Sequence, residues 1–248
     1  ITITTPPVAN AGVDQSVCIA NATLNGNAPG AGESGTWSLL SGAGTISFPS
    51  LNNSGVTALG VGSNKFVWKI SRTGCPDGKD TVQIIRKQAP ASNAGSSQSI
   101  CTSSANLSAQ IPVSGTGLWS LVSGTGTITN PSQPNTSVTG LGIGSNIFRW
   151  TVSDAPCASA TSDVTISREA NPVALGKDTL VCSNITPTYS LNGPAGMSTY
   201  LWSNGLNSSQ IGVTTPATYW LSVLTPGGCQ FSDTVVVGFQ VCDFVSSV

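Results

Sequence analysis

The sequence predicts an all-β chain of three consecutive β-sandwich domains, each with about seven strands. One segment, Gly35–Lys69, recurs nearly intact as Gly117–Thr151, and a shorter variant surrounds Tyr200–Gly205 and Ala217–Val223. Apolar and polar residues alternate within short β-branched runs, which is the period of a strand buried on one face. Glycine, proline, asparagine and serine separate these runs at the short intervals typical of a sandwich.

The repeats stay in phase along the chain. Cys18 recurs as Cys101 and Trp68 recurs as Trp150, at almost the same offset. We therefore expect tandem modules of about 80 residues, joined by short proline-containing linkers that favour an extended rod. The expected limits are residues 1–7 for the last strand of a preceding module and a proline linker, 8–88, 89–170 and 171–241 for the three modules, and 242–248 for a C-terminal tail.

Turn residues delimit seven short strands in the first module. The sixth is the clearest, because Phe66, Trp68 and Ile70 alternate with Lys65 and Lys69 and so share one buried face. The strands are expected near Ala11–Val17, Ala22–Asn25, Thr36–Leu39, Thr45–Phe48, Val56–Leu59, Lys65–Ser71 and Asp80–Arg86.

The second module repeats this pattern, with Phe148, Trp150 and Val152 inward and Arg149 outward. Tryptophan and leucine pairs supply the layer expected to face the sixth strand. These pairs are Trp37 with Leu39 and Trp119 with Leu121.

The third module is shorter and has drifted in sequence. Its Trp202 matches Trp37, and alternation favours Tyr219, Leu221 and Val223 facing inward. That alternation turns Trp220 outward. An exposed tryptophan on a β face indicates either a binding site for a glycan or a protein partner, or a contact at a domain junction.

Glycine-rich segments such as Ser41–Gly44, Ser123–Gly126 and Gly140–Asn146 superficially resemble phosphate-binding loops. They lack the lysine of a P-loop, and no helix is expected after them to provide a positive N-terminus. We interpret them as hairpin turns that need positive φ angles.

The composition excludes several functions. Charged residues make up 8% of the chain and the net charge is −1, which is too little positive charge to bind nucleic acid. No apolar run is long enough to insert into a membrane. Histidine is absent, and the two glutamates, Glu33 and Glu169, lie in a loop and at a joint. No catalytic residues, metal ligands or cofactor are therefore expected, and the chain is not predicted to be an enzyme.

Cysteines recur in phase with the modules. In each module one cysteine follows the first strand and a second follows the sixth, which predicts one disulfide per module and an oxidising, extracellular setting. Metal binding is the competing interpretation, but CxxC pairs and histidines are lacking. Cys242 is left over and is expected to be unpaired within this sequence. The predicted bonds are Cys18–Cys75, Cys101–Cys157 and Cys182–Cys229.

Aspartates near the module ends suggest one alternative, a calcium site between modules. Carboxylates and carbonyls at a junction between modules can hold Ca²⁺. No DxDxDG-type loop is present, and Ser97 replaces Asp14 in the second module. The residues considered are Asp14, Asp77, Asp80 and Asp178.

Three strings carry a family resemblance: ANAGVDQSVC at Ala9–Cys18, LWSLVSGTGTI at Leu118–Ile128, and GLGIGSNIFRWTVS at Gly140–Ser153. They resemble PKD-like and Ig-like modules of very long Bacteroidota surface proteins. Those proteins include gliding-motility-associated adhesins exported by type IX secretion. The resemblance covers almost the whole chain and implies Ig-like sandwiches at a bacterial cell surface. It is much less specific for function, because such modules are scaffolds.

The same resemblance implies O-glycosylation at Asp-Thr-apolar tripeptides, here at Thr81, Thr179 and Thr234. The second module departs from the pattern with Ser162–Thr165 (SDVT). The alternative is that Asp-Thr-Val simply begins a β-strand.

The sequence thus predicts a non-catalytic structural or adhesive repeat region, a stalk or presenting rod of a secreted or cell-surface protein. Its partners would be other copies or modules of the same protein, glycans or surfaces. One rival is an extracellular filament subunit that exchanges the strand Ile1–Thr4 with a neighbour. Another is a carbohydrate-binding module that uses Trp220 and the glycine loops.

Overall fold

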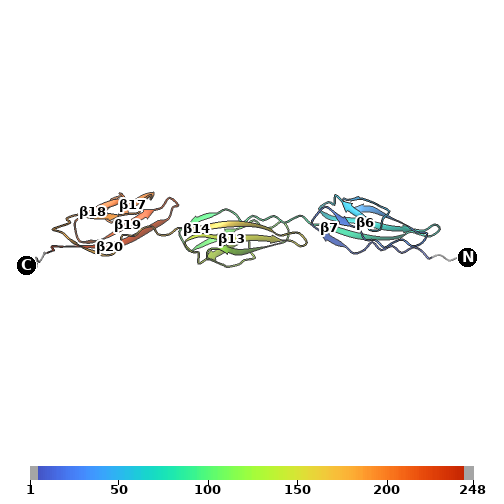
Figure 1. Cartoon of the computed structure of the whole chain (residues 1–248), viewed down its shortest axis with the longest axis horizontal. Coiled ribbons are helices and arrows are strands. Elements are labelled where there is room, and N and C mark those ends of the chain that lie inside the picture. Colours follow the sequence, from blue (N-terminus) through green and yellow to red (C-terminus); the bar gives the residue numbers. More distant parts are fainter. Residues whose placement is uncertain (1–4, 243–248) are drawn as a thin grey trace, which may run out of the picture. The chain divides into compact units, whose positions relative to one another are not determined.

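The computed structural model describes residues 5–242, which form strands and no helix. The strands fall into three consecutive groups, here called module one (β1–β7), module two (β8–β14) and module three (β15–β20) (Figure 1). Their bounds are β1 Gln15–Val17, β2 Ala22–Thr23, β3 Ser34–Ser41, β4 Thr45–Ile46, β5 Gly55–Thr57, β6 Gly62–Ser71, β7 Gly78–Arg86, β8 Gln98–Ile100, β9 Ser104–Ser108, β10 Thr116–Ser123, β11 Thr127–Ile128, β12 Asn135–Thr139, β13 Gly144–Ser153, β14 Ala160–Arg168, β15 Thr179–Cys182, β16 Tyr189–Asn192, β17 Thr199–Trp202, β18 Gln210–Val213, β19 Ala217–Leu224 and β20 Gln230–Gln240.

Each module is a sandwich of one four-stranded sheet and one smaller sheet. The larger sheets have the orders β1-β7-β6-β3, β10-β13-β14-β8 and β15-β20-β19-β17. The smaller sheets are β2-β5-β4, β11-β12-β9 and β16-β18. Module three has one strand fewer because only Ser203 to Ser209 separate β17 from β18.

The first and last strands of every module pair in parallel, whereas pairs such as β3 with β6, β6 with β7 and β19 with β20 are antiparallel. Val17 on β1 lies opposite Arg86 on β7, and Ile100 on β8 lies opposite Arg168 on β14. In module three, Cys182 lies opposite Gln240. The first strand therefore ends beside the end of the last strand in each module, which determines where the cysteines lie.

The alternation predicted for the long strands is confirmed. Phe66, Trp68 and Ile70 on β6 are fully buried. Arg149 projects outward from β13 and pairs with Asp163, with Nε 2.7 Å from Oδ1. The residues equivalent to Phe66, Trp68 and Ile70 are also buried in the other modules. They are Phe148, Trp150 and Val152 on β13 and Tyr219, Leu221 and Val223 on β19.

The predicted facing layer of tryptophan and leucine is wrong. β3 pairs directly with β6, so Trp37 lies beside Trp68 in the same sheet, with ring centroids 4.9 Å apart. Leu39 and Leu121 are each 41% exposed. Both leucines lie on edge strands of four-stranded sheets. In module one the core is completed by Leu24, Val56 and Leu59.

The glycine-rich segments contain glycines with positive φ, as expected, but the prediction of hairpin turns is wrong, because each segment links strands of two different sheets. Gly42 has a φ of +86°, and a Cβ there would lie 2.6 Å from the carbonyl oxygen of Ser63. Gly124 occupies the same place in module two with a φ of +83°. A side chain would be strained at both positions.

A buried asparagine fastens each of these turns to the core. Asn146 is 1% exposed; its Oδ1 accepts from the backbone N–H of Thr125, and its Nδ2 donates to the carbonyls of Gly142, Gly144 and Ile166. Asn64 makes the equivalent bonds in module one. One amide thus satisfies backbone groups of two loops and the last strand.

The chain divides into two compact units that do not coincide with the repeats. One contains the residues up to Asn93 with residues 109–118 and 150–162, and the other contains 94–108, 119–149 and the residues from Asp163 onward. Module two therefore contributes to both units.

Replacing Asn146 with leucine should destabilise module two by about 3 kcal/mol, because the buried backbone groups that it satisfies lose their partner. Chemical denaturation of the full chain, followed by tryptophan fluorescence, measures the change. Ser145→Leu is the matched control, since Ser145 is the exposed neighbour on the same strand. Equal effects of the two substitutions would contradict the role given to the amide.

Candidate functional site

The cysteines pair across module boundaries, so the predicted bonds Cys18–Cys75, Cys101–Cys157 and Cys182–Cys229 are wrong. Cys18 of module one bonds to Cys157 of module two, with Cα atoms 5.0 Å apart. Cys101 of module two bonds to Cys229 of module three, with Cα atoms 5.3 Å apart. Both bonds lie within a compact unit.

The parallel pairing of first and last strands explains the correction. Cys18 follows β1, whose last residue lies opposite Arg86 at the end of β7. Cys75 lies in the turn before β7 begins at Gly78. A strand rises about 3.3 Å per residue, so the two cysteines are separated by roughly the length of β7, about 30 Å. A disulfide requires Cα atoms within about 7 Å.

The first joint, here called joint one, combines the Cys18–Cys157 disulfide with an ion pair. Lys87 directly follows β7, and its Nζ donates to Oδ1 of Asp154, which directly follows β13. The backbone N–H of Cys157 donates to the carbonyl of Asp154 at 2.9 Å, so the turn fixes the cysteine relative to the aspartate. The Lys87 ammonium, acting mainly through this hydrogen bond, holds the pKa of the Asp154 carboxyl below its usual value.

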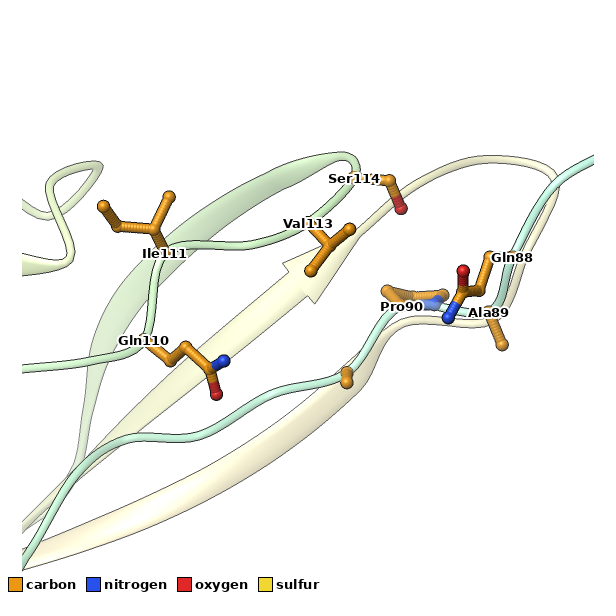
Figure 2. Close-up of a pocket in the computed structure, with 8 residues that line it drawn as sticks. Gln88, Ala89, Pro90, Gln110, Ile111, Val113 and Ser114 are labelled. Atoms are coloured by element: carbon orange, nitrogen blue, oxygen red, sulfur yellow. The ribbon is translucent and has the colours of Figure 1, made fainter.

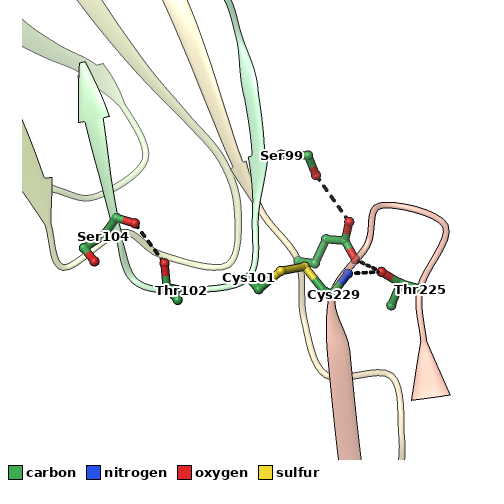
Figure 3. Close-up of a disulfide and its surroundings, with 7 residues drawn as sticks. Ser99, Cys101, Thr102, Ser104, Thr225 and Cys229 are labelled. Atoms are coloured by element: carbon green, nitrogen blue, oxygen red, sulfur yellow. Dashed lines mark hydrogen bonds between the residues drawn. A yellow bond between two sulfur atoms is a disulfide. The ribbon is translucent and has the colours of Figure 1, made fainter. Parts of the chain in front are cut away.

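Joint two has the same plan with different side chains (Figure 3). Glu169 directly follows β14, and its Oε2 accepts from Oγ1 of Thr225, which directly follows β19, at 2.6 Å. Thr225 Oγ1 in turn accepts from the backbone N–H of Cys229 at 3.0 Å. Ser99 Oγ donates to the other carboxylate oxygen of Glu169 at 3.2 Å. The carboxylate thus stands beside the Cys101–Cys229 bond.

The polar contacts of the two joints come from equivalent positions in the modules. The residue after the last strand of one module bonds to the residue after the penultimate strand of the next, beside a disulfide. The charge is reversed between them, since joint one has a cation on the earlier module and joint two has an anion. The position is therefore retained while its chemistry varies.

The third disulfide lies within module three. Cys182, at the end of β15, bonds to Cys242, which lies just beyond β20, with Cα atoms 5.3 Å apart. The expectation that Cys242 is unpaired within this sequence is therefore wrong. Asn184 accepts from the backbone N–H of Cys242 and donates to its carbonyl, which holds Cys242 in place.

Trp220 is exposed on the outer face of the large sheet of module three, as alternation predicts, with 38% of its surface accessible. Strand register places Leu201, Val236 and Leu180 on neighbouring strands, and all three are exposed. They form an apolar diagonal on an open sheet face. Whether Trp220 binds a glycan or a partner stays a prediction.

The aspartates named for calcium act as backbone caps. Asp80 Oδ2 accepts from the N–H of Ala11, Asp14 Oδ1 from that of Gln83, and Asp178 Oδ1 from that of Val236. Asp77 Oδ2 lies 3.6 Å from Lys69 Nζ, and hydrogen bonding to Ser71, with a contribution from Lys69, lowers its pKa. Within residues 5–242, no three acidic or cysteine side chains gather as a metal site. Calcium binding at the joints stays a prediction.

The Asp-Thr tripeptides therefore have a structural role, since their aspartates tie the first strand to the last. Asp233 repeats the bond of Asp80 by accepting from the N–H of Leu175. Thr81 and Thr234 are exposed, whereas Thr179 is half-buried and donates to the carbonyl of Lys177. O-glycosylation at the three threonines stays a prediction.

Two hollows on the described part of the chain were compared with the size of a ligand pocket. One of about 60 Å³ lies between the linker Gln88–Ala91 and the loop Gln110–Ser114 (Figure 2). A ligand pocket commonly has at least about 300 Å³. A larger hollow of about 460 Å³ lies on the outer sheet face of module one, beside Lys69 and Lys79. No acidic residue lines either hollow. No helix capable of crossing a membrane occurs within residues 5–242.

No protein-family model and no curated protein matches the chain. Among solved structures, it is similar to the complex of Dpr2 Ig1–Ig2 with DIP-Theta Ig1–Ig3, at 9% identity over 95% of this chain and 100% of that chain, with a TM-score of 0.52. It is also similar to Sidekick-1 immunoglobulin domains 1–5, at 15% identity over 95% of this chain and 60% of that chain, with a TM-score of 0.47. The modules are tandem Ig-like β-sandwich domains. At these identities the likeness establishes the fold alone.

Tryptic peptide mapping should recover Cys18 joined to Cys157, and Cys101 joined to the one peptide after Lys177 that carries Cys182, Cys229 and Cys242; a second digestion with chymotrypsin then identifies Cys229 as the partner. Trypsin places Cys18, Cys75, Cys101 and Cys157 on four different peptides, because lysine or arginine lies between each pair. Thiols are blocked before digestion under non-reducing conditions, and a reduced sample is the control. Recovery of Cys18 with Cys75 would restore the pairing within modules and contradict the joints.

The carboxyl of Asp154 should titrate below the ordinary aspartate value of about 3.9, and Lys87→Met should return it toward that value. Because the folded pKa is lowered, the ion pair stabilises the folded chain above the unfolded pKa and is lost as pH falls through the folded pKa. NMR titration measures the carboxyl. Lys177→Met, at an exposed lysine, is the control and should leave Asp154 unchanged.

Proposed function

We propose that this chain is a non-catalytic, load-bearing repeat region of an extracellular protein, whose consecutive Ig-like modules are tied together covalently. The observation that carries the proposal is the pair of disulfides between modules, Cys18–Cys157 and Cys101–Cys229. A disulfide inside a domain protects that domain only. A disulfide between domains also shortens the covalent path along which tension is transmitted.

The path is short because the disulfides bypass most of each module. From Cys18 tension passes to Cys157, then along the backbone to Cys182, and from there to Cys242. Only the segment from Cys157 to Cys182 lies on this path, a small fraction of the backbone between Cys18 and Cys242. β14 and β15 within it are already extended strands, so unfolding adds little length.

An extracellular location is part of the proposal. Three disulfides in one chain are expected in an oxidising compartment and are uncommon in the reducing cytosol. The motifs at Ala9–Cys18 and Gly140–Ser153 that resemble Bacteroidota surface modules support a bacterial cell surface. On that basis the region would serve as a stalk of an adhesin exported by type IX secretion.

The partner that fits these modules is another Ig-like module. The Dpr2 and DIP-Theta structure is itself a complex between chains of Ig domains. In this chain the joints bring neighbouring modules together through a disulfide and one polar contact. The strand-exchange filament depended on Ile1–Thr4, which lies outside the described residues.

Single-molecule stretching tests the load-bearing role. The oxidised chain, pulled by its ends, should reach a limit of about 90 Å between Cys18 and Cys242, whereas the reduced chain should reach about 780 Å at about 3.5 Å per residue. Unfolding steps should appear only after reduction. A long extension of the oxidised chain would contradict the proposal.

Two double variants provide matched controls. Cys18→Ser with Cys157→Ser opens the path to about 96 residues through Cys101–Cys229, and the limit should rise to about 340 Å. Cys101→Ser with Cys229→Ser removes a bond that is not on the short path through Cys157 and Cys182. The limit between Cys18 and Cys242 should therefore stay at about 90 Å. Equal lengthening by both pairs would show that the disulfides act only on module stability.

A further inference from the structure

We infer that the outer face of the large sheet in module one binds an acidic glycan, that is, a sugar chain bearing carboxylate or sulfate groups. The site is the hollow of about 460 Å³ on this face. Its lining residues are Thr36, Ser38, Leu40, Val67, Lys69 and Lys79. The inference goes beyond the load-bearing role, because it gives module one a ligand whose binding does not depend on the disulfides.

Two lysines lie directly opposite each other at this hollow. Strand register pairs Lys69 on β6 with Lys79 on β7. Opposite side chains on antiparallel strands have Cβ atoms about 5 Å apart, and like charges there destabilise the sheet. Asp77 offsets only part of this charge, because it forms an ion pair with Lys69 at 3.6 Å and the exposed Lys65 lies on the same face. An anion bound over the lysines would relieve the repulsion.

The fold does not require these lysines, since the other two modules lack them. Where module one has Lys69 opposite Lys79, the later modules have uncharged hydroxyl residues. The corresponding residues are Thr151 and Thr161 in module two and Ser222 and Ser232 in module three. Arg149, a cation on the outer face of module two, is already neutralised by two hydrogen bonds to Asp163. The lysine pair is therefore particular to module one, and folding alone does not explain it.

The other lining residues favour a sugar as the carrier of the anion. Thr36 and Ser38 present exposed hydroxyls from β3, whereas Leu40 and Val67 present apolar side chains. A sugar ring has hydroxyls along its edge and apolar C–H groups on its faces, so it matches both kinds of neighbour. The carboxylate or sulfate of the sugar then accepts hydrogen bonds from the two ammonium groups, and such charge-assisted bonds are stronger than neutral ones.

Other anions fit this face less well. β6 and β7 are paired on both sides, so their backbone groups cannot bind an extended peptide. A nucleic acid needs a longer row of cations than Lys65, Lys69 and Lys79 provide. A second copy of this chain offers no spare carboxylate, because each aspartate and glutamate within residues 5–242 already accepts a hydrogen bond or forms an ion pair.

NMR titration of the full chain with trigalacturonate, a carboxylated trisaccharide, tests the inference. The chain is produced without O-glycosylation, because Thr81 lies opposite Val67 beside the hollow. The backbone amide signals of Ser38, Val67 and Lys79 should shift and saturate. The uncharged galactotriose should bind about 4- to 25-fold more weakly, which is the product of two exposed charge contacts. Tighter binding of a sulfated galactotriose would equally support the inference and would identify sulfate as the preferred anion.

The sequence of module two provides the matched variant. Lys69→Thr with Lys79→Thr installs the residue type that module two carries at both positions, so the sheet should fold and trigalacturonate should bind about 4- to 25-fold more weakly. If the double variant does not fold, Lys79→Gln alone should weaken binding about two- to fivefold. Lys177→Met removes an exposed lysine of module three and should leave binding unchanged.

Three results would overturn the inference. One is the absence of shifts at about 10 mM of either acidic sugar, where a ligand with a millimolar dissociation constant is bound. A second is equal binding of triglutamate at the same signals, which would show that charge alone is recognised. A third is unchanged binding by the lysine variants, or shifts centred on Trp220 instead. None of these results affects the load-bearing role, which the stretching experiment tests separately.

Discussion

Parallel pairing between the first and last strands is the constraint on which the joints depend. Because β1 runs beside β7 in the same direction, the end of β1 lies where the chain leaves module one. The turn before β7 lies one strand length away, where the chain enters. Each module thus presents one cysteine position at its exit and another at its entrance. Covalent bonds between modules follow from this topology and from short linkers.

A polar contact accompanies each of the two disulfides that join modules. Lys87 and Asp154 use opposite charges, whereas Glu169 and Thr225 use a carboxylate and a hydroxyl. Both contacts come from residues that directly follow strands, so their backbones are fixed by the sheets. A surface ion pair contributes little free energy of folding by itself. We therefore assign the Lys87–Asp154 pair a role in orienting the two strand ends.

Strand alternation in the sequence was enough to predict the sandwich modules, the buried faces of β6, β13 and β19, and the outward Trp220. The same alternation also indicated two buried asparagines, which the sequence analysis did not identify. Asn64 and Asn146 continue the inward alternation of Phe66 and Phe148, so an inward polar residue pointed to the buried amides. The positive φ of glycines such as Gly42 was predictable for the same local reason. Local patterns determine these features.

The cysteine pairing was not predictable from spacing alone. In-phase positions are equally consistent with bonds inside modules and with bonds shifted by one module. The choice depends on the direction of β1 relative to β7, which is a long-range property of the sheet. The same long-range pairing placed Trp37 beside Trp68 instead of opposite it.

The overlap of the disulfide loops has a consequence for survival outside the cell. The loop closed by Cys18–Cys157 overlaps the loop closed by Cys101–Cys229, and Cys182–Cys242 overlaps the second. A protease that cuts the backbone once, anywhere between Cys18 and Cys242, leaves both pieces in one covalent molecule. The exposed loops of this chain can therefore be nicked without severing it.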